Sequence, residues 1–270
     1  MDEEQISEVT PVKRHKRDTV YDNAFKSMSS NCTELIVPVI NEMFGEKYSK
    51  DSAKIEILNN EFFQNNLEGK KDAKRADLVL TISDKGMPKK YHIECQSEVD
   101  KTMIIRIFEY ATQIALDKKT LSELLKPSDD EITLKFPRSA LLYLRSWGTT
   151  PDKFKINVEI SNQTVVYEIP IMKVKNYDVE EIFEKDLLFL IPFHLFALEN
   201  EFEKYENNET KLAELQKEYE FIADRLNKLY EEKRLEVNSF LEISGWTKQI
   251  ADQLAGNYAK VREGVKEAMQ

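Results

Sequence analysis

Residues 75–97 read RADLVLTISDKGMPKKYHIECQS, and this stretch decides the fold. The apolar, largely β-branched run at residues 78–82 predicts a strand. The segment DKGMP at residues 84–88 predicts a turn, and residues 91–95 resume the strand pattern. We therefore expect a β-hairpin around which the rest of the chain is arranged.

Strand alternation divides the side chains of the second hairpin strand between two faces. His92, Glu94 and Gln96 are expected on one face, and Tyr91, Ile93 and Cys95 on the other. Asp77, on the first strand, can bring a second carboxylate to the same edge of the sheet as Glu94. Two carboxylates at that distance repel each other unless a cation lies between them. The hairpin therefore predicts a Mg²⁺ site, which Mn²⁺ can also fill.

Length and composition indicate a globular protein with long exposed helices. The chain has 270 residues, 41% hydrophobic and 33% charged residues, and two cysteines, too few for a disulfide framework. It opens MDEEQISEVT, without the charged-then-apolar pattern of a secretion signal. The most apolar run, residues 187–198, is too short to span a membrane. We expect a cytoplasmic protein with no membrane partner.

The charge distribution bears on nucleic-acid binding. A net charge of −10 has the wrong sign for a protein whose whole surface holds nucleic acid. Residues 199–236 hold 12 acidic and 7 basic side chains, so this segment alone contributes −5. Basic clusters remain at residues 13–17 and 70–75, where a phosphate backbone can be held locally. Residues 1–17 are interpreted as a mobile arm, either a solvated tail or a segment that touches phosphate.

The order of predicted elements indicates an α/β fold. Residues 21–44 predict two short helices, residues 54–58 a strand, residues 59–66 a polar loop, residues 100–116 an amphipathic helix and residues 139–145 a buried strand. This order, αβββαβ, implies a mixed β-sheet flanked by helices. A second hairpin, residues 155–160 and 164–169, extends or covers the core, and residues 182–202 close it. We place this domain at residues 18–202.

Arg106, Tyr110 and Gln113 form a second stripe on the helix of residues 100–116. Its apolar stripe is expected to pack on the sheet. The second stripe can then offer a cation, a hydroxyl and an amide to whatever lies above the carboxylates.

Residues 203–270 predict a helical, coiled-coil-like extension. Six large side chains follow a heptad spacing at Leu212, Leu215, Tyr219, Ile222, Leu226 and Leu229. Gly245 is expected to interrupt the helical pattern before a last helix at residues 250–269. The seam at 212–229 fits either an internal helical hairpin or a homodimer. A twofold dimer would also present any site on the chain twice, which makes the homodimer the slightly favoured arrangement.

Four short motifs, in order, carry a family resemblance: YDNAFK at residues 21–26, IEILN at 55–59, RAD at 75–77 and IECQ at 93–96. Together they resemble the PD-(D/E)XK nuclease superfamily. The closer resemblance is to its Rpn-type recombination-promoting nucleases, also called putative transposases. The resemblance covers roughly residues 20–200. Gln96 stands where the superfamily motif has Lys, and this branch commonly has Gln there.

The resemblance implies a metal-dependent DNA endonuclease linked to recombination, transposition or defence against foreign DNA. It implies Asp77 and Glu94 as metal ligands, with the backbone carbonyl of Cys95 as a third. Gln96 can orient the attacking water or a phosphate oxygen, but it cannot supply the charge of a Lys. Lys26 and Arg106 then carry more of the electrostatic work.

Each assignment has an alternative. Asp22 is either an additional ligand or a helix N-cap, and Lys26 is either functional or a solvated helix lysine. The alternative for the whole chain is a catalytically weak or inactive nuclease-fold protein. Such a protein would serve as a DNA-binding or oligomeric interaction module.

Overall fold

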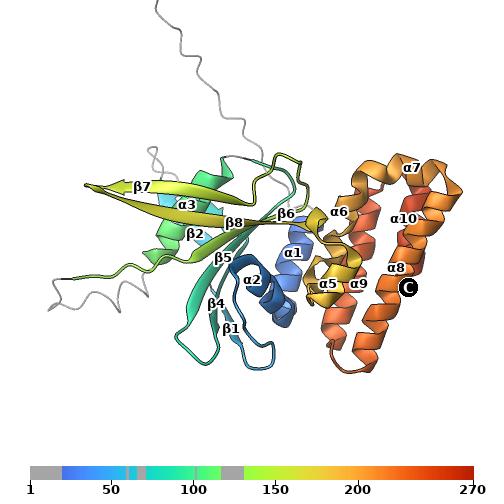
Figure 1. Ribbon diagram of the computed structural model, residues 1–270, viewed down its shortest axis with the longest axis horizontal. Coiled ribbons are helices and arrows are strands. Elements are labelled where there is room, and N and C mark those ends of the chain that lie inside the picture. Colours follow the sequence, from blue (N-terminus) through green and yellow to red (C-terminus); the bar gives the residue numbers. More distant parts are fainter. Residues whose placement is uncertain (1–19, 59–60, 66–70, 101, 117–130) are drawn as a thin grey trace, which may run out of the picture.

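A six-stranded mixed sheet forms the centre of the chain in the computed structural model (Figure 1). The model describes residues 20–58, 61–65, 71–100, 102–116 and 131–270. The predicted arm at residues 1–17 lies outside this range. The molecule is a mixed α/β protein with helices on both faces of the sheet, which confirms the predicted fold class at this level.

The sheet has the strand order β1-β4-β5-β6-β8-β7. Its strands are β1 (Lys54–Ile57), β4 (Leu78–Ser83), β5 (Lys89–Gln96), β6 (Arg138–Tyr143), β7 (Lys153–Ile160) and β8 (Gln163–Lys173). The β1–β4, β4–β5 and β7–β8 pairs are antiparallel, whereas β5–β6 and β6–β8 are parallel. The expected hairpin is present as β4 and β5.

One prediction about the region before the hairpin is wrong. The sequence predicts a polar loop at residues 59–66. The structure instead has a separate antiparallel pair, β2 (Glu61–Asn65) and β3 (Lys71–Arg75). The adjacent aromatic residues Phe62 and Phe63 favour a strand, and the surrounding Asn residues obscured that signal.

Two short helices cover one face of the sheet. They are α1 (Val20–Asn31) and α2 (Ile36–Phe44), joined through the 3₁₀ segment η1 (Thr33–Leu35), and both were predicted. The chain breaks between the two helices before Pro38. This proline lies in the first turn of α2, where a main-chain N–H would have no acceptor within the helix. Apolar side chains of α1, α2 and the strands form the largest core cluster on this face.

The opposite face of the sheet is covered by α3 (Met103–Ala115), the helix that crosses over between the parallel strands β5 and β6. Met103 packs in a cluster with Tyr143, next to the end of β5. At the other end of α3 the Lys90 ammonium donates to the Ile114 carbonyl, at 3.5 Å. The helix therefore runs antiparallel to β5. Its first turns lie over the end of that strand.

The remaining helical segments form the C-terminal third of the chain. They are η2 (Val174–Asn176), α5 (Val179–Glu184), η3 (Leu188–Phe193), α6 (Leu195–Leu198), η4 (Glu199–Glu201), α7 (Phe202–Asn207), α8 (Glu209–Glu231), α9 (Val237–Leu254) and α10 (Ala259–Ala268). The apolar run at residues 187–198 is a buried core segment, as predicted. Gly245 does not interrupt α9, and the break predicted there falls instead at residues 255–258. The predicted boundary at residue 202 coincides with the start of α7.

The heptad seam of α8 is covered within the chain. Leu215, Tyr219, Ile222 and Leu226 are buried and belong to the same core cluster as Val261 of α10. This cluster also includes side chains of α1 and the sheet, so one continuous core extends from the sheet into the C-terminal helices. An internal helical arrangement thus satisfies the seam. Of the two arrangements that the sequence allowed, the internal one covers the seam, so a homodimer is not required for that purpose.

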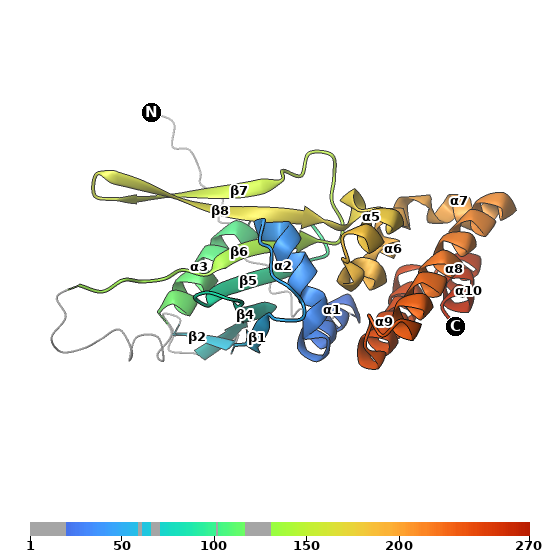
Figure 2. The same cartoon turned by 60° about the horizontal axis from the view of Figure 1, so that its bottom comes forward.

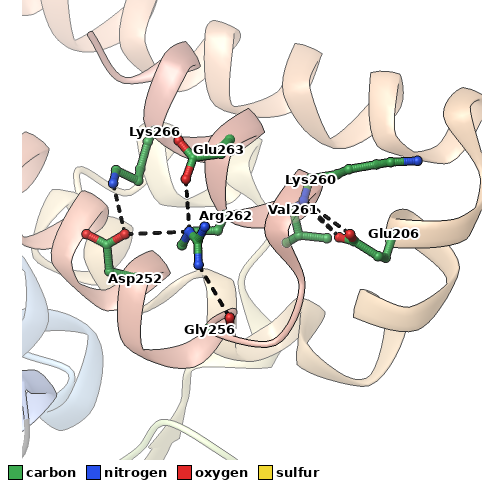
Figure 3. A network of polar contacts seen from close by, with 8 residues as sticks. All are labelled: Glu206, Asp252, Gly256, Lys260, Val261, Arg262, Glu263 and Lys266. Atoms are coloured by element: carbon green, nitrogen blue, oxygen red, sulfur yellow. Dashed lines mark hydrogen bonds and ion pairs between the residues drawn. The ribbon is translucent and has the colours of Figure 1, made fainter.

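Polar contacts tie α7, α9 and α10 together (Figure 3). The Glu206 carboxylate accepts hydrogen bonds from the main-chain nitrogens of Lys260, at 3.0 Å, and Val261, at 3.3 Å, at the start of α10. A carboxylate in this position satisfies unpaired helix N–H groups and faces the positive end of the helix dipole. Lys266 pairs with Asp252 of α9 at 2.9 Å. These contacts fix α10 over the seam.

Strands β7 and β8 form a ribbon that extends past the sheet (Figure 2). Only residues 171–173 of β8 pair with β6, so the rest of the ribbon is supported by its own two strands. Val165 and Ile160 near its tip are more than half exposed. Lys153 and Lys155 both pair with Glu168 across the ribbon, at 3.1 and 3.0 Å.

Across the part of the chain that the structure describes, no helix combines the length and apolar character that crossing a membrane requires.

The covered seam makes a testable prediction about stability. Leu226→Ala removes a fully buried side chain from the α8 seam and should lower the free energy of unfolding by about 2–5 kcal/mol. Urea denaturation followed by circular dichroism measures this change. Leu241→Ala, at a 60% exposed position on α9, is the control and should change the free energy by less than about 0.5 kcal/mol. A Leu226→Ala protein of unchanged stability whose subunits dissociate in light scattering would show that a partner covers the seam.

Candidate functional site

The register of the β4–β5 hairpin brings Asp77 and Glu94 together. Leu78 pairs with Ile93, and Val79 with His92. Continuing this antiparallel register by one residue places Asp77, just before β4, opposite Glu94. Directly opposed side chains share a face of the sheet. Val79 packs with Tyr110 of α3, whereas Leu78 and Ile93 enter the core beneath α1 and α2. The two carboxylates therefore belong to the face that α3 covers.

Reciprocal hydrogen bonds fix the two acidic residues. The main-chain nitrogen of Asp77 donates to Glu94 Oε1, at 3.1 Å. The main-chain nitrogen of Cys95 donates to Asp77 Oδ2, at 2.9 Å. Each carboxylate is thus held by the main chain of the opposite strand segment. Glu94 is buried, with 1% exposure, and Asp77 is half-buried.

Cys95 contributes main chain to the site and side chain to the core. Its thiol is buried in the cluster beneath α1 and α2, as predicted from strand alternation. In an extended strand the N–H and C=O of one residue point toward the same neighbouring strand. Since the Cys95 N–H meets Asp77, its carbonyl also faces the edge where Asp77 lies. A main-chain carbonyl that binds the same cation as Asp77 must face this edge.

Two side chains of the predicted α3 stripe interact with each other, and one of them, Tyr110, also interacts with the carboxylates. Burial raises the pKa of the Tyr110 hydroxyl, and the negative charge of Glu94 raises it further. The Arg106 guanidinium, which hydrogen-bonds the hydroxyl, acts in the opposite direction on this pKa, and Asp77 adds a smaller increase. Tyr110 therefore interacts with Arg106 and with both carboxylates. Tyr110 is almost fully buried, so it forms part of the wall of the site rather than an exposed hydroxyl.

Gln96 lies on the same face of β5 as Glu94. Its side chain is 7% exposed, and its Nε2 is buried without a hydrogen-bond partner among the described residues. A buried amide donor without a partner is costly, because its hydrogen bonds to water are lost and not replaced. The amide is therefore well suited to a water or ligand oxygen brought into the site.

The other predicted residues lie on α1 and near the end of α3. Gln113 is seven residues beyond Arg106 on α3, an axial rise of about 10 Å toward the start of β5. Asp22 is buried and Lys26 half-buried on α1, a helix whose apolar side chains belong to the core on the other face.

The sequence did not reveal a chain of hydrogen bonds behind Glu94. His92 is fully buried, and its Nε2 lies 3.0 Å from Glu94 Oε1 while its Nδ1 lies 3.0 Å from Ser139 Oγ. Tyr167 of β8 donates to the Ser139 hydroxyl, at 2.7 Å. The alternation of β5 predicted that His92 shares the face of Glu94. Its partners come from β6 and β8, whose lateral order a single sequence does not reveal.

The donor set fits a hard divalent cation in part. Among the described residues, no group of three or more His, Cys, Asp and Glu side chains is arranged to hold a metal ion. Mg²⁺ commonly binds through one or two carboxylates and keeps several waters, so a larger group is not required. Within the same part of the chain, Glu94 Oε2 receives no hydrogen bond, which leaves it available to a cation.

Comparison of the chain with family models, with curated proteins and with solved structures found no match.

The hydrogen-bond chain behind Glu94 predicts non-additive mutational effects. Ser139→Ala and Tyr167→Phe should each lower the free energy of unfolding by about 1 kcal/mol, because each removes a buried hydroxyl from the chain. The double variant should lose less than the sum of the two, since both changes remove the same Tyr167–Ser139 bond. Urea titrations of the four proteins measure this coupling. Strict additivity would show that the two hydroxyls do not act together.

Proposed function

We propose that this protein is a metal-dependent phosphodiesterase that cleaves DNA, with its reaction centre at Asp77 and Glu94. The reciprocal main-chain hydrogen bonds that hold these two carboxylates carry the proposal. The αβββαβ order and the four motifs that resemble Rpn-type nucleases add support. Recombination, transposition, mobile-element biology or defence in the cytoplasm are the settings that this resemblance suggests.

Asp77, Glu94 and the Cys95 carbonyl would hold Mg²⁺, and Mn²⁺ would serve as a substitute. A bound hard cation supplies charge stabilisation to the phosphate and lowers the pKa of a coordinated water. The protein fixes the carboxylates before any ion arrives, because both are bound to main-chain N–H groups. This preorganisation reduces the entropy lost when the site is filled.

Two neighbouring residues have separate tasks. The unpartnered Gln96 amide donates a hydrogen bond to the attacking water or to a phosphate oxygen. Arg106, in electrostatic contact with Tyr110 beside the carboxylates, contributes the positive charge that Gln96 lacks. The role that Lys has in the superfamily motif is thus shared by the amide of Gln96 and the guanidinium of Arg106.

A second candidate function is a nuclease-fold protein that binds DNA without turnover. The observation in its favour is that Glu94 Oε1 already receives the Asp77 N–H and lies within hydrogen-bonding distance of His92. An oxygen satisfied in this way is a weaker ligand. The absence of Lys at position 96 points in the same direction.

Metal binding and cleavage test the proposal together. At a concentration about 100 times its Kd, Mn²⁺ or Mg²⁺ should stabilise the protein by about 2.7 kcal/mol and raise Tm by roughly 5–10 °C. Plasmid DNA incubated with either ion should be cleaved, and a chelator should stop the reaction. Asp77→Asn and Glu94→Gln should each reduce cleavage by at least about 100-fold while the proteins remain folded.

Glu159→Gln is a matched carboxylate control, because Glu159 is exposed on β7. It should leave both the thermal shift and the cleavage rate unchanged. Full metal-dependent cleavage by folded Asp77→Asn would refute the site. A thermal shift without cleavage by the unmodified protein would favour the non-catalytic candidate.

Gln96 should affect turnover more than metal binding. Gln96→Ala removes a donor aimed at water or phosphate but no proposed metal ligand, so kcat should fall about 10²- to 10³-fold. The Mn²⁺ affinity, measured by calorimetry, should stay within a few-fold of the unmodified value. Gln96→Lys should retain activity because it restores a cationic donor. A large loss of Mn²⁺ affinity in Gln96→Ala would identify the amide as a ligand.

A further inference from the structure

A rigid turn at residues 147–150 follows β6 and presents an exposed tryptophan. Trp147 is 62% exposed, yet its main chain is firmly held. The Thr150 N–H donates to the Trp147 carbonyl, at 2.9 Å, and the Trp147 N–H donates to Thr150 Oγ1, at 3.0 Å. Thr150 itself is buried. The indole therefore projects from a closed, hydrogen-bonded turn.

Two lysines hold this turn against the sheet. Lys173, at the end of β8 and 8% exposed, donates to the Thr150 carbonyl, at 2.6 Å, and pairs with Asp152, at 2.7 Å. The exposed Lys175 donates to the Ser146 carbonyl, at 2.7 Å. Burying an ammonium group is unfavourable unless it is fully hydrogen-bonded. The fold thus uses a buried charge to fix the position of a solvent-facing indole.

The turn lies at the same edge of the sheet as the candidate site. Strand β5 reaches this edge at Gln96, which pairs with Tyr143 of the parallel strand β6. The Leu144 N–H also donates to the Gln96 carbonyl, so Trp147 follows three residues after a hydrogen-bond partner of Gln96. The connection between β6 and β7 stands at the end of the sheet that faces the C-terminal helices (Figure 2).

We propose that Trp147 is a base-stacking residue through which the protein binds single-stranded nucleic acid next to its reaction centre. Aromatic side chains on a rigid support stack on unpaired bases of any sequence, and nearby lysines attract the backbone. The inference rests on the proposed function, and it names the substrate class as DNA with unpaired nucleotides. Such DNA offers the exposed base faces that a duplex hides within its own stack.

The surroundings of Trp147 favour a nucleic acid over a protein partner. Protein interfaces gather several apolar side chains in a packed centre. Trp147 instead stands between Ser146 and Gly148, and the neighbouring Thr149 is exposed and polar. Asp152 neutralises the charge of Lys173, and the exposed Lys175, whose ammonium is bonded to the Ser146 carbonyl, supplies positive charge at this turn. An exposed indole can stack on a base while the neighbouring cation contacts the phosphate.

The chain provides its own probe for this contact. It has two tryptophans, and Trp246 on α9 is half-buried, with its indole N–H bonded to Glu242. In a Trp246→Phe protein, Trp147 is the sole tryptophan. A single-stranded oligothymidylate added in the presence of a chelator should quench its emission, since stacking on a base brings the indole into direct contact. A duplex of equal length should cause little quenching.

Affinity measurements with a labelled oligonucleotide complete the test. By fluorescence anisotropy, Trp147→Leu should weaken binding of the single strand about 5- to 150-fold and binding of the duplex little. Leu241→Ala, which removes an equally exposed apolar side chain from α9, should change neither. If Trp246→Phe fails to fold, the difference in emission between the unmodified protein and Trp147→Phe reports the same contact.

The outcomes separate this inference from the proposed function. Binding of the single strand without quenching, or with unchanged affinity in Trp147→Leu, would overturn the stacking role alone. A protein partner would then be the explanation for the exposure of Trp147. Quenching with no cleavage under any metal would support stacking and refute the enzyme. Absence of any binding by anisotropy would overturn the stacking role, whereas plasmid cleavage tests the proposed function separately.

Discussion

The antiparallel register of β4 and β5 is the constraint on which the rest of the structure depends. Pairing Leu78 with Ile93 sends both side chains into the main core and places Asp77 against Glu94 on the other face. A shift by one residue would turn the apolar side chains toward α3 and the acidic ones into the core beneath α1 and α2. The packing of the core and the geometry of the site are therefore set by the same hydrogen-bond ladder. Neither can change without the other.

Sequence reasoning succeeded where information is local. Alternation along β5 predicted which face receives Glu94 and Gln96 and which face receives Cys95, because strand periodicity needs no knowledge of the partner strands. The helical period likewise predicted that Arg106 and Tyr110 share a stripe. It did not predict how deeply Tyr110 is buried, since burial depends on how α3 lies across the sheet.

The side-by-side order of the strands could not be predicted, because it depends on contacts between distant parts of the chain. His92 stood on the predicted face, but its contacts with Ser139, and through it with Tyr167, require β6 and β8 to lie in a particular order beside β5. The heptad spacing of α8 showed that its seam needs a cover, and periodicity cannot distinguish a cover within the chain from one on another chain. The continuity of the core from α1 through α10 provides that answer.

The ribbon of β7 and β8 has a consequence for the behaviour of the protein at high concentration. β7 is the outermost strand of the sheet, and a row of its main-chain groups is directed away from β8. Such an edge is a template for adding strands from other molecules, as in amyloid growth. Lys153 and Lys155 lie along it and are balanced by Glu168, so a strand that docked there would have to strip water from charged groups. The ribbon can thus extend into solvent while its own charges protect the chain from aggregation.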